Sequence, residues 1–124
     1  MTQEQKDLLL KDLCARLPYK VKVQIKNVSK ICTLEEIDCN SDEMSVAVKH
    51  ENGELNGYDF DLAKPYLFPL SSMTEEQKTS HNFLKHSVYA NPIKLVDWYN
   101  KNHFDYRGLI PMGSAIDATG KNIY

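Results

Sequence analysis

The sequence predicts an α+β fold, and three observations support this class. Leucines recur with helical spacing over residues 3–16, alternating apolar and polar residues mark four short strands between residues 19 and 62, and two helix-start signals follow residue 70. Strands that are grouped apart from helices are typical of α+β proteins, whereas regular alternation would indicate a parallel sheet. Because 124 residues is the length of one domain, we expect residues 1–124 to fold as a single α+β domain.

The first predicted helix covers residues 3–16. Thr2 and Gln5 have the spacing of a capping box, and Pro18 ends the helical pattern. The apolar face is expected to hold Leu9, Leu10, Leu13, Cys14 and Leu17, and the polar face Lys6, Asp7, Lys11 and Asp12. We therefore expect Cys14 to be buried and Asp12 to face solvent.

Four strands are expected to follow as an antiparallel meander. They cover residues 19–26, 31–37, 44–48 and 58–62. Asn52-Gly53 is the strongest hairpin signal, although Asn56-Gly57 competes with it. Short turns between neighbouring strands favour antiparallel pairing with one solvated face, and a strongly bent, SH3-like sheet is one form that such a meander can take.

The rest of the chain is expected to be mostly helical. Residues 64–70 contain two prolines and should form an extended crossover that packs across the sheet. Ser72 and Glu75 resemble a capping box for a helix at about 73–86, and Asn91-Pro92 resembles the start of a second helix. An aromatic loop then closes one face.

The stretch 97–113 concentrates residues that often take part in binding. It holds four of the twelve aromatic residues and one of the two arginines. Its candidate partner-binding residues are Trp98, His103, Asp105, Tyr106 and Arg107, because aromatic and arginine side chains dominate binding hot spots. The alternative is structural: the aromatic rings fill a small core, while Asp105 and Arg107 hold the loop by hydrogen bonds.

Charge is unevenly distributed along the chain, although the formal net charge is only −2. Residues 35–61 carry nine acidic residues against Lys49 alone, which favours an acidic sheet face, with Glu35, Asp59 and Asp61, that binds a basic partner protein. Residues 18–34 carry lysines and no acid, so Lys20, Lys22 and Lys26 could instead contact the phosphates of a nucleic acid. A third interpretation is a solvated face on which opposite charges pair across strands.

Motifs for catalysis or metal binding are weak. Asp97, His103 and Asp105 could form an acid/base cluster, but no nucleophile accompanies them, and only an unseen Cys–His pair would supply one. The run Asp38-Asn40-Asp42 lacks the glycine and glutamate of a calcium loop, and the three cysteines lack metal-site spacing. We predict a non-enzymatic protein without cofactor or metal.

Three segments carry a resemblance to known proteins. KPYLFPLSSMTEEQ, DWYNKNHFDYRGLIPMG and AIDATGKNIY resemble small uncharacterised proteins encoded by phages and mobile elements of gut bacteria. The resemblance implies an accessory factor in the cytoplasm of a bacterial host, and it assigns no role to any residue. Lys20 stands where the resemblance leads us to expect glycine, and Ser114 where it leads us to expect an apolar residue.

The sequence therefore predicts a non-enzymatic accessory protein that binds another protein through an acidic sheet face and an aromatic loop. The alternatives are a nucleic-acid-binding module and a small enzyme. Free thiols, the polar start and the lack of a long apolar run favour a cytoplasmic protein without membrane contact. The sequence does not predict the oligomeric state.

Overall fold

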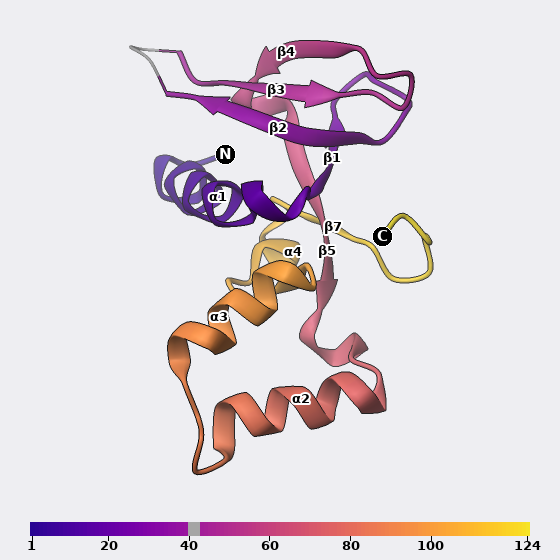
Figure 1. Cartoon of the computed structure of the whole chain (residues 1–124). Coiled ribbons are helices and arrows are strands. Elements are labelled where there is room, and N and C mark those ends of the chain that lie inside the picture. The colour runs from indigo at the N-terminus through magenta and orange to yellow at the C-terminus, as the bar shows by residue number, and fades with distance from the viewer. Residues whose placement is uncertain (40–42) are drawn as a thin grey trace.

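The computed structural model describes residues 1–39 and 43–124, and the fold is α+β with an N-terminal helix, a mostly antiparallel sheet and C-terminal helices (Figure 1). The helices are α1 (Gln3–Arg16), α2 (Glu75–His86), α3 (Pro92–Lys101) and α4 (Leu109–Met112). The strands are β1 (Lys22–Ile25), β2 (Cys32–Asp38), β3 (Ser45–Lys49), β4 (Leu55–Asp59), β5 (Ala63–Pro69), β6 (Phe104–Asp105) and β7 (Ile116–Asp117).

Helix α1 has the predicted bounds but buries a different face. The Thr2 and Gln5 capping box is formed. The buried residues are Leu9, Asp12, Leu13 and Arg16, which follow the i, i+3, i+4, i+7 spacing of one helical stripe. The expectation for Asp12 was wrong because Asp12 lies within this stripe, and the expectation for Cys14 was wrong because Cys14 lies beside the stripe and is exposed.

The antiparallel meander of β1, β2, β3 and β4 is confirmed, and the turn falls at Asn52-Gly53. Gly53 adopts a φ of +88°, where glycine avoids the strain that a side chain would cause. The fourth strand begins three residues earlier than predicted, because Asn56-Gly57 lies within β4 and residues 60–62 form a 3₁₀ turn. Strand β1 is shorter than predicted, since residues 17–19 also form a 3₁₀ turn.

The segment predicted as a crossover is strand β5, which lies inside the sheet. β5 pairs antiparallel with β1 and parallel with β6 and β7, giving the order β4-β3-β2-β1-β5-β6 with β7 also on β5. Two prolines are tolerated because Pro65 lies at the last aligned position of the β1–β5 pair and Pro69 is the last residue of β5, so neither interrupts the middle of the pairing with β1. The order β5-β1-β2-β3-β4, with a 3₁₀ turn before β5, is compatible with the bent SH3-like sheet considered above.

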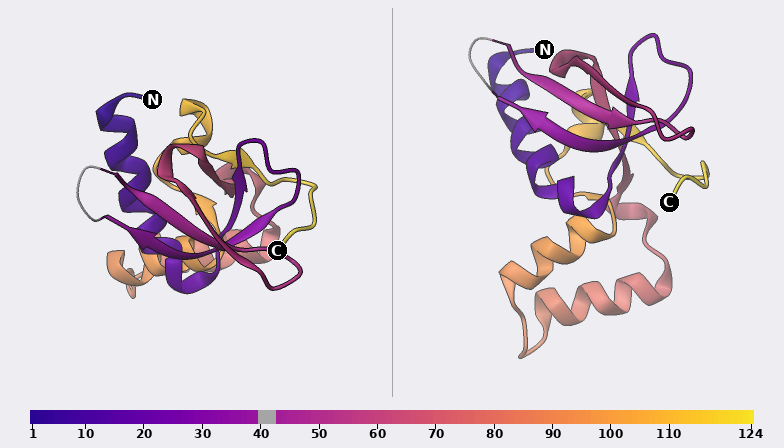
Figure 2. Two further views of the ribbon diagram at one scale, coloured as in Figure 1. Left: turned by 90° about the horizontal axis from the view of Figure 1, so that it is seen from above. Right: turned by 45° about the horizontal axis from the view of Figure 1, so that its top comes forward.

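The main core lies between α1 and the sheet, whereas α2 and α3 form a hairpin that extends away from the sheet (Figures 1 and 2). Helix α2 starts from a capping box of Thr74 and Gln77 instead of Ser72 and Glu75, and α3 starts at Asn91-Pro92 as predicted. All of α2 lies within the described part of the chain, and none of its residues is buried. Every helix within residues 1–39 and 43–124 is too short or too polar to cross a lipid bilayer.

Candidate functional site

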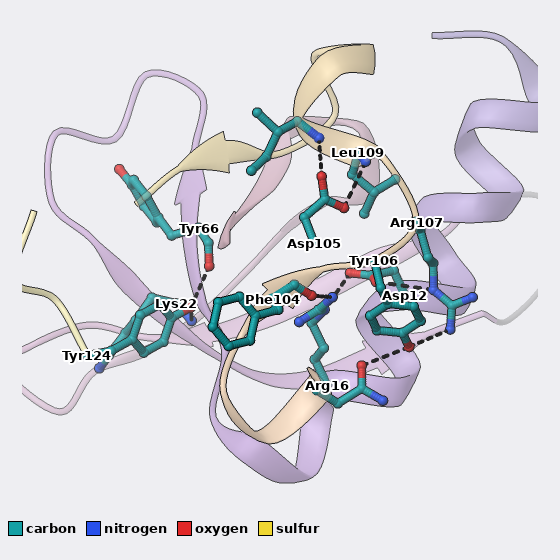
Figure 3. A network of polar contacts seen from close by, with 12 residues as sticks. Asp12, Arg16, Lys22, Tyr66, Phe104, Asp105, Tyr106, Arg107, Leu109 and Tyr124 are labelled. Atoms are coloured by element: carbon teal, nitrogen blue, oxygen red, sulfur yellow. Dashed lines mark hydrogen bonds and ion pairs between the residues drawn. The ribbon is translucent and has the colours of Figure 1, made fainter. Parts of the chain in front are cut away.

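A buried ion-pair network connects α1 to the aromatic loop (Figure 3). Nε of Arg16 lies 2.8 Å from one carboxylate oxygen of Asp12, and Nε of Arg107 lies 3.2 Å from the other. The side chains of Asp12 and Arg16 are fully buried, and that of Arg107 is 19% exposed. One carboxylate therefore accepts from two arginines that lie 91 residues apart in the sequence.

Tyr106 completes this network. Its ring lies 5.4 Å from the guanidinium carbon of Arg16 and 4.8 Å from that of Arg107, which is cation–π distance. Its hydroxyl accepts from Arg107 and donates to Asn100. Arg16 also donates to the carbonyl of Phe104, so the buried guanidinium anchors strand β6. The loop is thus held by α1 and α3 together.

Asp105 and His103 also face partners inside the protein. The two carboxylate oxygens of Asp105 accept from the backbone N–H groups of Leu109 and Ile110, both at 2.9 Å, and so cap the start of α4. His103 stacks on Tyr124 with 3.7 Å between ring centroids. Burial, with the nearby charges of Arg16 and Lys22, lowers the pKa of His103 to about 4.

These contacts agree with the structural alternative for the aromatic loop. Trp98 stacks on Phe104 at 5.3 Å between centroids and is half-buried. Asp105 is 7% exposed, so it offers little surface to a partner. Partner binding by the loop remains a prediction, but its side chains are mainly occupied by contacts within the protein.

A different surface, the α2–α3 hairpin, exposes large apolar side chains. Val88 is 94% exposed, Ile93 76%, Tyr89 73% and Phe83 53%. We call these four residues the hairpin patch. Phe83 and Tyr89 stack on each other at 5.9 Å between ring centroids. Helix α2 is joined to α3 by a 2.6 Å hydrogen bond between the side chains of His81 and Tyr99.

Two of the candidate acidic residues of the sheet region lie in one cross-strand row. The register aligns Asp38, Ser45 and Asp59 in one row across β2, β3 and β4. Glu35 lies at an irregularity in the β2–β3 pairing and is exposed, as is Asp59. Asp61 lies after β4 and pairs with Lys6 of α1 at 3.3 Å. The structure therefore brings Asp38 and Asp59 onto one face, while Asp61 is linked to α1.

The three candidate phosphate-contacting lysines lie in different local settings. Lys20 lies before β1, in a left-handed backbone conformation. Lys22 donates to the hydroxyl of Thr33 on β2, and Lys26 lies beyond the end of β1, beside a separate cleft. Phosphate binding by these lysines stays a prediction.

The Cys–His pair that the sequence left open is present at Cys32 and His50. Sγ of Cys32 lies 3.5 Å from Nδ1 of His50, and the hydroxyl of Tyr58 lies 3.3 Å from Nε2 of the same ring. Cys32 is buried, and this burial raises the pKa of its thiol. A covered, protonated thiol is a poor nucleophile, so this arrangement gives little support to the enzyme alternative. Sequence spacing could not reveal the pair, because β2 and β3 bring its members together.

The contacts of Asp105 and His103 do not join them into the acid/base cluster considered from the sequence, since Asp105 accepts from backbone amides and His103 stacks on Tyr124. Within residues 1–39 and 43–124, no three His, Cys, Asp or Glu side chains are grouped to hold a metal ion. Asn40 and Asp42 of the incomplete calcium motif lie outside the described residues. Comparisons with protein-family models, curated protein sequences and solved structures find no match.

Proposed function

We propose that this protein is a non-enzymatic accessory protein that binds another protein through the hairpin patch. The observation that carries this proposal is the exposure of four large apolar side chains on the α2–α3 hairpin. This hairpin forms the end of the molecule that is remote from strands β1–β4 (Figure 1). Grouped exposed apolar residues favour an interaction surface, whereas isolated ones are ordinary. Aromatic residues such as Tyr89 and Phe83 are also enriched among binding hot spots.

The hairpin patch is built as a firm surface. Asn91 caps α3 by accepting from the N–H groups of Ile93 and Lys94, which fixes the connection between the helices. The N–H of Asn91 also donates to the carbonyl of Leu84. A patch on such a braced connection loses little conformational entropy on binding.

The charges around the patch suit a partner with an apolar groove and an acidic rim. Lys85 and Lys94 are exposed beside the patch, and the helices α2 and α3 carry four lysines. Asp97 is the only acid after the first turn of α2 within these two helices. Carboxylates on the partner would therefore meet lysines around an apolar centre, as in other protein interfaces.

Site-specific photo-crosslinking tests this proposal. A photoreactive phenylalanine analogue at position 89 should crosslink to one partner in host cells, whereas the same analogue at Leu55 should not. Leu55 is a matched control because it is also apolar and exposed, but lies on β4. The hairpin proposal is wrong if the two positions give the same products.

The purified partner then allows a quantitative test. V88D and I93D should each weaken its affinity at least tenfold, while L55D should leave the affinity unchanged. Sedimentation analysis of the protein alone tests whether the hairpin patch binds a second copy of the same chain. If the protein alone forms a dimer and I93D abolishes it, the patch mediates self-association, and the proposal of a different partner protein is wrong.

The acidic sheet face supports a second candidate, binding of a basic partner protein. The specific observation is the row that places Asp38 and Asp59 on one face across three strands. Such binding should weaken with D59K, which should not affect a contact centred on the hairpin patch, whereas high salt should weaken binding at either surface. A phage or mobile-element origin, with a bacterial cytoplasmic location, remains part of the proposal and awaits identification of the partner.

A further inference from the structure

A cleft of about 500 Å³ lies between α1, the β1–β5 strand pair and the segment after α4. This volume lies within the usual range for small-molecule sites, which is about 300–1,000 Å³. Apolar side chains of Leu9, Leu62 and Met112 form part of its lining, and Gln5 and Ser114 contribute polar groups. None of these side chains belongs to the hairpin patch, so the cleft is a separate feature of the molecule.

Two lysines converge on this cleft because of the strand register. Gln24 lies opposite Lys64 in the antiparallel β1–β5 pair, and the N–H of Lys26 donates to the carbonyl of Leu62. Lys26 and Lys64 are therefore diagonal neighbours on the same face of the sheet, within reach of one another's charged groups. Both are exposed and line the cleft.

The charge balance of the cleft is positive. Asp61 is the only acidic residue among its described lining residues, and its carboxylate lies 3.3 Å from Nζ of Lys6. This ion pair offsets the negative charge of Asp61, and the ammonium groups of Lys26 and Lys64 remain to attract an anion. The cleft thus combines two cations with an apolar lining, so both a charged head and an apolar tail would find contacts.

We propose that this cleft binds a small amphiphilic anion, with a phosphate or carboxylate head at Lys26 and Lys64 and a short apolar tail against Leu62 and Met112. Gln24 and Gln5 can donate further hydrogen bonds to the head group. This ligand class differs from a nucleic acid, because a cleft of this volume with a lining that is part polar and part apolar suits a single small molecule. The proposal stands independently of partner binding at the hairpin.

Octyl phosphate is a suitable probe, below its micelle concentration, in a nuclear magnetic resonance titration of the ¹⁵N-labelled protein. We expect saturable shifts of the amide signals of Gln24, Lys64 and Gly113, which line the cleft. Inorganic phosphate, which lacks the tail, should bind at least tenfold more weakly. Octylammonium, which has the same tail and the opposite charge, should produce no saturable shift at these positions.

The double variant K26Q/K64Q should weaken octyl phosphate binding at least tenfold, because it removes both cations without adding a repulsive charge. Both side chains are exposed, so the fold should persist, and the amide spectrum verifies this. K85Q/K94Q is the matched control, since it removes two exposed lysines from the hairpin and should leave binding unchanged. Equal binding of octylammonium, or unchanged affinity in K26Q/K64Q, would overturn the proposal.

Discussion

The aromatic loop and the α2–α3 hairpin use similar residues in opposite ways. In the loop, residues 103–107 place their side chains against α1, α3 and the C-terminal segment. In the hairpin, Phe83 and Tyr89 stack mainly on each other and remain more than half exposed. An aromatic-rich composition therefore indicates that a segment forms contacts, but the fold decides whether those contacts are internal or are offered to a partner.

The difference arises from long-range pairing. Strand β6 joins β5 in parallel, with Phe104 opposite Phe68, and this pairing places the loop beside the buried face of α1. The hairpin has no strand that joins it to the sheet: α2 packs against α3, whereas α3 also packs against β6 and α1. Changes in the two regions can test whether the side chains of the loop support the fold while those of the hairpin patch do not.

The largest effect is expected from D12A. This change leaves Arg16 buried without its carboxylate and also removes a hydrogen bond from Arg107. Breaking a buried ion pair by removing one partner costs about 3–5 kcal/mol. Urea unfolding monitored by circular dichroism should therefore show a large drop in the midpoint, and the free energy of unfolding should fall by about that amount.

K11A on the same helix is the control, because Lys11 is exposed and its removal should change the free energy of unfolding by less than about 0.5 kcal/mol. The loss of unfolding free energy in R107A should lie between those of D12A and K11A, since Arg107 is partly exposed and Arg16 still neutralises Asp12. If D12A is as mild as K11A, the loop is not held by this network.

A smaller effect is expected from the titration of His103. Its pKa lies at about 4 in the folded protein and at 6.5 in the unfolded chain, so the unfolded state takes up the proton first as the pH falls. The free energy of unfolding should be unaffected by this group above pH 6.5 and should decrease between pH 6.5 and about 4. Because solvent reaches part of the ring, we expect about 1–2 kcal/mol.

The pH dependence of H103N tests this assignment. Asparagine tolerates the φ of 61° at this position, and it does not titrate. The difference in unfolding free energy between the wild type and H103N should therefore shrink as the pH falls from 6.5 to 4. Parallel profiles for H103N and the wild type would contradict the assignment.

Much of the fold could be predicted from local patterns, because capping residues, strand alternation and Asn52-Gly53 act over a few residues. The pairing of β5 could not, since two prolines obscure its strand pattern and its partners lie far away in the sequence. The burial of Asp12 was equally hidden, because only the fold shows that Arg16 and Arg107 meet it. The cleft beside Lys26 and Lys64 depends on a distant pairing in the same way, because β1 and β5 bring these two lysines together.

The smallest effect on stability is expected at the hairpin patch. The triple variant V88S/Y89S/I93S replaces three side chains that are each more than 70% exposed, so little buried apolar surface is lost. Asn91, whose side chain caps α3, is retained. The free energy of unfolding should therefore change by no more than about 1 kcal/mol, a sum of three small surface effects.

This mild variant sharpens the comparison because the same three changes should abolish partner binding. A residue that matters for binding but not for folding is one whose contacts are made outside the protein.

F104S is the matched counterpart in the aromatic loop, since Phe104 is 1% exposed and stacks on Trp98. It should cost about 3–5 kcal/mol, as expected for truncation of a buried aromatic ring. If the triple variant is as destabilising as F104S in urea unfolding, then the hairpin patch supports the fold, and the distinction between an internal loop and an outward-facing hairpin fails.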